Sequence, residues 1–200
     1  MKKLTSILIA LYLIAGCSSG GGVSGGAGGA GTFTTDSGLV LAASLTPIGG
    51  ISVDAFVTIC DVDMDTGEAT VETGITTKLG TFTVTVVDAT DLTGGLFPRG
   101  ITLDSYTVEF AGQRPGAPFL TPRTFAETFS ILSGNGTASA TVVLMDLDTI
   151  DREFQMQSSG SIVSYVVTVT FRGRDLNGEF LQIVASTFLE LGDFDRCDTN

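Results

Sequence analysis

Two residue types are missing from this chain of 200 residues: it has no histidine and no tryptophan. The missing imidazole excludes Ser-His-Asp and Cys-His catalysis, and also histidine-ligated zinc and haem. Without tryptophan the sequence also lacks the side chain best suited to stack on a sugar ring. Few familiar kinds of active site are left.

Positive charge is also scarce, with 10 basic residues against 22 acidic ones and a formal net charge of −12. A chain this acidic repels the phosphates of nucleic acids and anionic lipid headgroups, so no nucleic acid is expected as a partner. Hydrophobic residues make up 43% of the sequence, which is enough for one domain to bury a core.

The first 17 residues, MKKLTSILIALYLIAGC, have the parts of an export signal. Lys2 and Lys3 precede an apolar stretch of about 12 residues, which is too short to span a bilayer core of roughly 30 Å. The end of the stretch, Ile14-Ala15-Gly16-Cys17, resembles the lipobox of bacterial lipoproteins. An ordinary secretory signal with an incidental cysteine is the alternative.

The lipobox resemblance implies that residues 1–16 are a signal peptide removed before Cys17, and that the Cys17 sulfur is diacylated. Ser18 follows where an inner-membrane retention aspartate could stand, so the family's sorting pattern implies a lipid anchor in the outer membrane. Residues 17–31 then form a flexible glycine-rich tether, since ordering so many glycines costs too much backbone entropy.

Residues 32–200 form a single domain in which the polarity alternates with a period of two, as in β-strands. Because helices do not alternate with the strands, the pattern predicts an antiparallel β-sandwich of about eight to nine strands, favoured over a barrel. Two glycine-containing turns, Gly134-Asn135-Gly136 and Asn177-Gly178, predict hairpins. A short helix is expected at 148–156, with Asp148 as its cap. The strands are expected at 38–45, 52–60, 69–76, 80–88, 101–110, 124–132, 137–145, 162–171 and 180–191.

The C-terminal stretch VTVTFRGRDLNGEFLQIVASTFLELGDF resembles the closing hairpin of immunoglobulin-like domains in exported bacterial proteins. ITLDSYTVEF, followed by a proline-containing loop, is similar to passages of small uncharacterised bacterial lipoproteins. The resemblance implies an immunoglobulin-like sandwich and brings no catalytic residues with it.

The segment GQRPGAPFLTPR, residues 112–123, holds three of the five prolines. Proline removes backbone donors, so the segment must leave the sheet. It is interpreted either as a rigid crossover between two sheets or as a partner-binding loop. The partner-binding residues would be Arg114 and Arg123, with Phe119 and Leu120 exposed.

Two cysteines remain after Cys17, and in an exported protein Cys60 and Cys197 are expected to form a disulfide. Their bond would close a long loop, stabilise the fold by roughly 4–5 kcal/mol and hold the C-terminal tail. Two reduced cysteines are the alternative.

Acidic residues after Cys60 occupy positions 1, 3, 5 and 12 of a calcium-loop count, but Thr66 stands where that loop needs glycine. The flanking segments alternate like strands, which excludes helix-loop-helix geometry. If the disulfide forms, the tail would bring more carboxylates to the same place, where Ca²⁺ could bridge them. A solvated acidic turn is the alternative. The candidate ligands are Asp61, Asp63, Asp65, Glu72, Asp193 and Asp195.

A third acidic group, Asp146, Asp148 and Asp151, is interpreted as a capped turn at a strand end. Together these features predict a lipid-anchored envelope protein with a structural or protein-interaction role and no catalysis. A calcium-stabilised adhesion or carbohydrate-binding domain is the alternative. A glycosidase working through paired carboxylates is a third hypothesis, although no residue marks such a pair. The sequence predicts no oligomeric state.

Overall fold

The computed structural model describes residues 31–34, 40–47, 50–56, 59–62, 64–71, 75–88, 100–131, 136–158 and 160–194. The predicted signal peptide, Cys17 and most of the tether lie outside these ranges. Within them strands predominate, as the period-two pattern predicted, and the one helical segment is short. No helix of this described part is long and apolar enough to cross a membrane.

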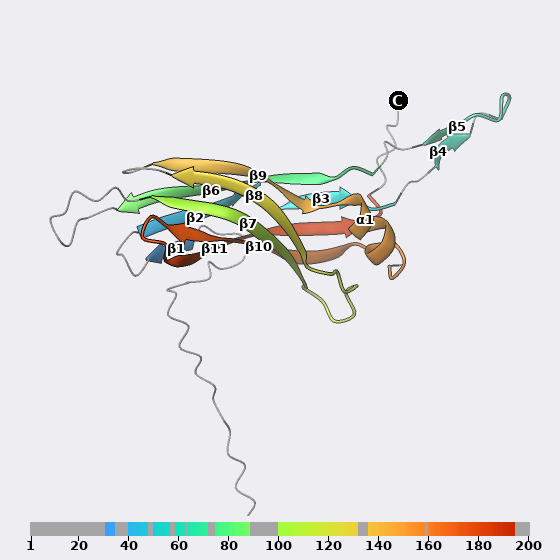
Figure 1. Ribbon diagram of the computed structural model, residues 1–200. Helices are drawn as coiled ribbons and strands as arrows, with labels where there is room; N and C mark the ends of the chain where they lie inside the picture. The colour runs from blue at the N-terminus through green and yellow to red at the C-terminus, as the bar shows by residue number, and fades with distance from the viewer. Residues whose placement is uncertain are drawn as a thin grey trace, which may run out of the picture.

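Four strands form one antiparallel sheet in the order β1-β2-β6-β9 (Figure 1). Its register brings threonines and serines of β2, β6 and β9 onto the outer face, while Leu45, Phe82 and Ala140 point into the core. The strands are β1 (Gly31–Thr34), β2 (Val40–Thr46), β6 (Lys78–Asp88) and β9 (Thr137–Met145).

Five strands form a second, curled sheet in the order β3-β11-β10-β7-β8. All its pairs are antiparallel except β3 with β11, which are parallel. The predicted hairpin at Asn177-Gly178 is confirmed: Gly178 has φ +83° and its N–H donates to the carbonyl of Asp175 at 3.0 Å. The strands are β3 (Ile51–Asp54), β7 (Ile101–Gly112), β8 (Arg123–Ile131), β10 (Val163–Asp175) and β11 (Phe180–Gly192).

The two sheets pack face to face over one hydrophobic core. Phe82 of β6 meets Phe171 of β10 with ring centroids 4.6 Å apart. The ring of Tyr106 in β7 is tilted against the same Phe171 ring, with centroids 5.0 Å apart, and its hydroxyl accepts a hydrogen bond from the N–H of Val143 in β9 at 2.9 Å. Alternate residues of each strand therefore meet those of the opposite sheet, which is how two half-polar sheets bury their apolar sides.

The predicted strand 52–60 is wrong in its extent. The hydrogen-bonded pairing of this segment with β11 ends at Asp54, the last residue of β3. There the Asp54 carboxylate accepts hydrogen bonds from the N–H groups of Phe56 and Phe194 at 3.3 and 3.4 Å. Those bonds turn the backbone out of the sheet. A separate two-stranded ribbon follows, formed by β4 (Ile59–Val62) and β5 (Ala69–Val71), and it projects from the sandwich (Figure 1). The described part thus has eleven strands, more than the eight or nine predicted.

The predicted short helix is confirmed as α1 (Leu147–Thr149), which continues into the π-helical turn η1 (Ile150–Phe154). Asp146, and not Asp148, is the cap, since its Oδ1 accepts from the N–H of Thr149 at 2.7 Å. The capped-turn interpretation of this acidic group therefore holds with a different capping residue. Asp148 is in the first turn, where a carboxylate favours the helix dipole, and it takes part in ion pairs.

Candidate partner-binding site

The proline-containing loop, residues 113–122, joins β7 to β8, which are hydrogen-bonded neighbours in the same sheet. The interpretation as a crossover between two sheets is therefore wrong. The loop runs outward because prolines at 115, 118 and 122 cannot donate to a sheet ladder. It lies at the same end of the sandwich as α1 (Figure 1).

One residue of this loop is an anchor in the core: Leu120 is 1% exposed. The sequence interpretation had Leu120 exposed beside Phe119, and the structure corrects it. Beside this anchor the buried hydroxyl of Tyr165 donates to the carbonyl of Pro118 at 3.0 Å. Because strand β10 brings Tyr165 beneath the loop, a long-range contact decides which of two adjacent apolar residues is inside.

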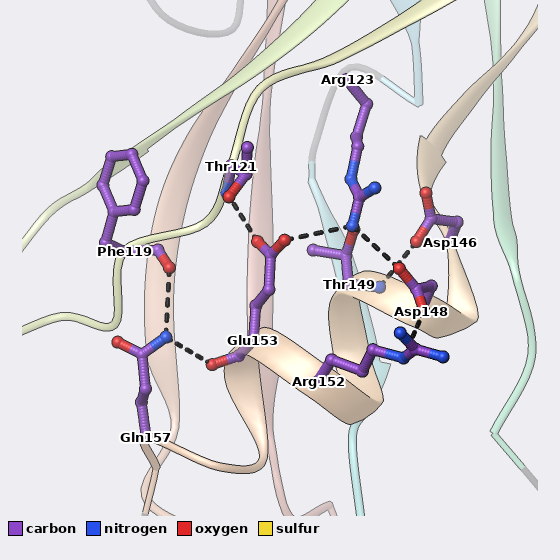
Figure 2. Close-up of polar contacts among 9 residues, drawn as sticks. All are labelled: Phe119, Thr121, Arg123, Asp146, Asp148, Thr149, Arg152, Glu153 and Gln157. Carbon is purple, nitrogen blue, oxygen red and sulfur yellow. Dashed lines mark hydrogen bonds and ion pairs between the residues drawn. The ribbon is translucent and has the colours of Figure 1, made fainter.

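A polar network ties the loop to the helical segment (Figure 2). One Glu153 oxygen accepts from the N–H of Thr121 at 2.6 Å, and the other pairs with the Arg123 guanidinium at 3.1 Å. Arg123 also pairs with Asp148 at 3.1 Å, and Arg152 contacts Asp148 at 2.7 Å. The Glu153 side chain is 19% exposed, so its interactions are only partly screened by solvent.

Gln157 holds the same stretch of the loop from below. Its side-chain amide donates to the carbonyl of Phe119 at 3.3 Å and to the carbonyl of Glu153 at 2.7 Å. The loop backbone is thus bonded at Pro118, Phe119 and Thr121, with Leu120 buried between them. These partners were missed in the sequence because helical spacing alone does not show which loop a helix faces.

The Phe119 side chain is the exception in this fixed segment, since it is 71% exposed and points away from the polar network (Figure 2). Met156, one residue before Gln157, is 80% exposed. Arg114, the other basic candidate of the loop, is exposed, whereas Arg123 forms ion pairs within the network. An aromatic side chain held in water on a rigid backbone loses little conformational entropy when a partner covers it.

Burial changes the chemistry of two tyrosines, Tyr165 beneath the loop and Tyr106 between the two sheets. Loss of hydration raises the pKa of Tyr165 to about 12. Burial likewise raises the pKa of Tyr106, although the hydrogen bond from Val143 acts in the opposite direction. Both hydroxyls therefore stay protonated and serve as hydrogen-bonding groups at neutral pH.

The interior behind Arg123 offers no ligand site. The hollow lined by Arg123, Phe125, Met145, Asp146 and Thr149 leaves no room for a bound molecule. Arg123 Nε and Thr149 Oγ1 are buried there without a hydrogen-bonding partner. A partner could therefore contact this end of the molecule only at its exposed surface and not in this hollow.

The predicted calcium and disulfide residues fall mostly outside the described ranges. Asp61 and Cys60 lie in β4, but their side chains, and all of Asp63, Glu72, Asp195 and Cys197, are not described. Asp65 is exposed in the turn after β4, and Asp193 is exposed after β11. Among the described residues no three cysteines or carboxylates gather closely enough to hold a metal ion. Both the disulfide and the Ca²⁺ site stay predictions.

Comparison with protein-family models, with curated proteins and with solved structures finds no match to this chain.

Proposed function

We propose that this chain is a lipid-anchored protein of the bacterial outer membrane whose β-sandwich binds a protein partner in the envelope and carries out no catalysis. The lipobox at Cys17 and the glycine-rich tether support the anchor. The tether would let the domain move about 20 Å from the lipid surface. Nucleic acid is not a partner of a chain with net charge −12.

The observation that carries the interaction role is the exposed Phe119 on a backbone held at three neighbouring residues. Folding does not require this ring, because Leu120 already supplies the loop's apolar anchor. An exposed aromatic group on a preorganised loop has the features of a binding hot spot. Arg114 and Met156 would lie at the rim of the contact.

An immunoglobulin-like topology fits the strand order. In that fold one sheet contains the order A-B-E and the other contains G-F-C, extended by C′ in variable-type domains. The order β2-β6-β9 matches the first, and β11-β10-β7-β8 matches the second. The loop with Phe119 would then be the C–C′ connection.

Two experiments test the anchor and the site separately. Cells expressing the full chain should incorporate radiolabelled palmitate into the protein, and Cys17→Ala should abolish the label. Unlabelled wild-type protein secreted in soluble form would contradict the anchor and leave an ordinary secretory signal.

For the binding site, a photo-reactive phenylalanine analogue is placed at position 119 of the full chain and irradiated in cells. The matched control is position 180, a phenylalanine 58% exposed at the opposite end of the sheet. One adduct of defined mass at position 119 and none at 180 is expected. Equal adducts at both positions, or none at 119, would contradict the partner-binding role of the loop.

A further inference from the structure

The outer face of the curled sheet carries two arginines without ion pairs, close to the turn between β10 and β11 and opposite α1 (Figure 1). Arg172 and Arg174 are exposed on either side of the buried Gly173, so both side chains leave the same face of β10. Arg172 Nη1 donates to the Thr107 hydroxyl at 3.3 Å, and Arg174 Nη1 donates to the carbonyl of Gly178 at 2.8 Å. Among the described residues no carboxylate pairs with either guanidinium. Most of their N–H donors are therefore left for a ligand or for water.

Strand β11 places an aromatic ring and an amide directly beside these arginines. The register of the hairpin pairs Arg174 with Phe180 and Arg172 with Gln182. The Phe180 side chain is 58% exposed, and Gln182 is exposed as well. Because Arg174 is bonded to the turn, its guanidinium is held near Gly178 while the ring stays in solvent. A flat apolar surface thus lies next to several directional hydrogen-bonding groups.

A bulge in β7 adds a carboxylate to the same face. The pairing of β10 with β7 runs from Arg172↔Ser105 directly to Gly173↔Leu103, so Asp104 is an extra residue. Asp104 is exposed and Ser105 is half-buried, although in a regular strand one of two neighbours would point into the core. The bulge turns both outward, which is how bulges re-aim side chains beside functional sites. The Asp104 carboxylate accepts from the Ser105 hydroxyl at 3.1 Å and keeps further acceptor capacity.

The balance of charge on this face limits what can bind there. Two arginines disfavour a cation, whereas the exposed Asp104 and Glu179 and the net charge of −12 disfavour an anion. An uncharged molecule with many hydroxyl groups meets neither obstacle. Each hydroxyl both donates and accepts, so it needs donors and acceptors side by side, as they occur here. The apolar side of a sugar ring also fits against an exposed aromatic ring.

From these observations we infer that the outer face of β7, β10 and β11 beside their common turn binds an uncharged saccharide. Phe180 packs against the apolar face of one sugar ring. Arg172 and Gln182 donate to its hydroxyl oxygens, and Asp104 accepts from a hydroxyl. Arg174, held by the turn, donates to the same or the next sugar unit. The donors and the ring lie on central strands of the sheet, so little ordering is needed on binding.

This site goes beyond the proposed protein-binding role and lies at the other end of the sandwich from the β7–β8 loop. The inference depends on neither the lipid anchor nor the protein partner. A bound saccharide gives no protein adduct, so position 180 is still the control for the adduct expected at position 119. A phenylalanine covers less of a sugar than tryptophan would, and the chain has no tryptophan, so weak binding is expected.

Bead sedimentation with the full chain tests the site. The protein, in a detergent without sugar groups, is mixed with increasing amounts of cross-linked dextran, agarose, cellulose or chitin, and the bound fraction is measured. Retention on at least one matrix is expected. Arg172→Ala should weaken it about tenfold or more, because a charged hydrogen-bond donor is lost. Phe180→Ala should weaken it about threefold or more, and Phe180→Tyr should retain it.

Matched controls separate this site from charge and from stickiness. Lys78→Ala removes one positive charge from the other sheet and should leave retention unchanged. Leu176→Ala removes a side chain 48% exposed in the same turn and should also leave it unchanged. Arg172→Lys keeps the charge but loses the planar fork, so it should weaken retention. Dextran is compared with carboxymethyl dextran, which adds carboxylates to the same polymer. Thermal unfolding of each variant checks that the fold is retained.

Four results would overturn the inference. The first is no retention on any of the four matrices. The second is retention that Arg172→Ala and Phe180→Ala leave unchanged. The third is an equal loss in Leu176→Ala and Phe180→Ala, which would indicate unspecific apolar adsorption. The fourth is retention on carboxymethyl dextran alone, which would indicate an anion site.

Discussion

At the scale of single residues, Phe119 and Leu120 show how adjacent apolar side chains can have opposite roles. Leu120 is buried in the core, whereas the Phe119 ring lies in solvent. The backbone around these two residues is held by hydrogen bonds to the side chains of Tyr165, Gln157 and Glu153. Contacts with β10 and the helical segment therefore decide which of the two side chains is buried.

Substitution of these two residues should show that only Leu120 contributes to the stability of the folded state. Leu120→Ala is expected to lower the free energy of unfolding by about 2–5 kcal/mol, because it leaves a cavity in a packed core. Phe119→Ala should change it by no more than about 0.5 kcal/mol. Urea unfolding of both variants measures this. A large loss in Phe119→Ala would mean that the ring supports the fold and would weaken its assignment to a partner.

Tyr165 should make stability fall at alkaline pH. Its folded-state pKa is about 12, above the ordinary value of 10, because of burial. Below pH 10 both folded and unfolded states keep the proton, and the stabilising contribution is complete. Between pH 10 and 12 only the unfolded state ionises, so about 2–3 kcal/mol is lost.

Tyr165→Phe removes this titration and the bond to the Pro118 carbonyl. The variant should be less stable than wild type by about 1–3 kcal/mol at pH 7. It should also lose less stability between pH 10 and 12, with Tyr106 accounting for part of what remains. Denaturant titrations at pH 7, 10 and 12 make the comparison. An unchanged alkaline decline would show that Tyr165 does not cause it.

At the scale of elements, the helical segment α1–η1 holds the β7–β8 loop in place through hydrogen bonds and ion pairs. Glu153 is the central residue, since it bonds both Thr121 and Arg123. The prolines restrict the loop, and the Glu153 carboxylate helps to hold it on the sandwich together with the buried Leu120 and the bonds from Tyr165 and Gln157. In the proposed binding role of Phe119, this segment would hold the loop in position for a partner.

Removing the Glu153 carboxylate should free the loop. Glu153→Ala is expected to cost about 1–3 kcal/mol and to speed hydrogen exchange at the Thr121 amide, which loses its acceptor. Glu153→Gln keeps an oxygen for that amide and should show a smaller increase. If hydrogen exchange at the Thr121 amide is equally fast in wild type and Glu153→Ala, the Glu153 carboxylate does not hold the loop.

The pairing of β10 with β7 requires glycine at position 173. The register shifts between Arg172 and Gly173, and a Cβ at this position would come 2.0 Å from the Thr102 carbonyl oxygen. Gly173→Ala should therefore cost about 3 kcal/mol, the upper part of the usual range for overpacking. Gly178→Ala, where no atom is close but φ is +83°, should cost about 1–2 kcal/mol. Thermal unfolding compares them, and an equal loss would contradict the close approach.

At the scale of the whole molecule, the excess of acidic residues limits what can approach the domain. With net charge −12, cations and uncharged surfaces are favoured as contacts. The β4–β5 ribbon and the residues after β11 carry the carboxylates for which calcium was predicted.

Calcium binding by these carboxylates has a direct test. If Asp61, Asp63 and their neighbours form a site, Ca²⁺ raises the thermal midpoint relative to a chelator, because a ligand that binds only the folded state stabilises it. Asp61→Asn with Asp63→Asn should remove the rise. Mg²⁺ at equal ionic strength controls for screening. An unchanged midpoint would leave a solvated acidic turn, and the adhesion alternative would lose its basis.

Much of the architecture could be predicted from local pattern. The period of two correctly predicted strands. The turn at Asn177-Gly178 and the helix near residue 150 lie at the predicted positions, because turn and helix preferences act over a few residues. The division of 52–60 into β3 and β4 was not predicted. It depends on Asp54 bonding Phe194, 140 residues away.

The sequence by itself determined the β-structure of the domain and the acidic character of its surface, since strand period and charge are properties of the local chain. Long-range packing decided that Leu120 is buried and that β9 is an outermost strand. An alternating strand has the same sequence pattern in the middle of a sheet as at its side. Only its neighbours in space decide whether its backbone groups remain open to another chain.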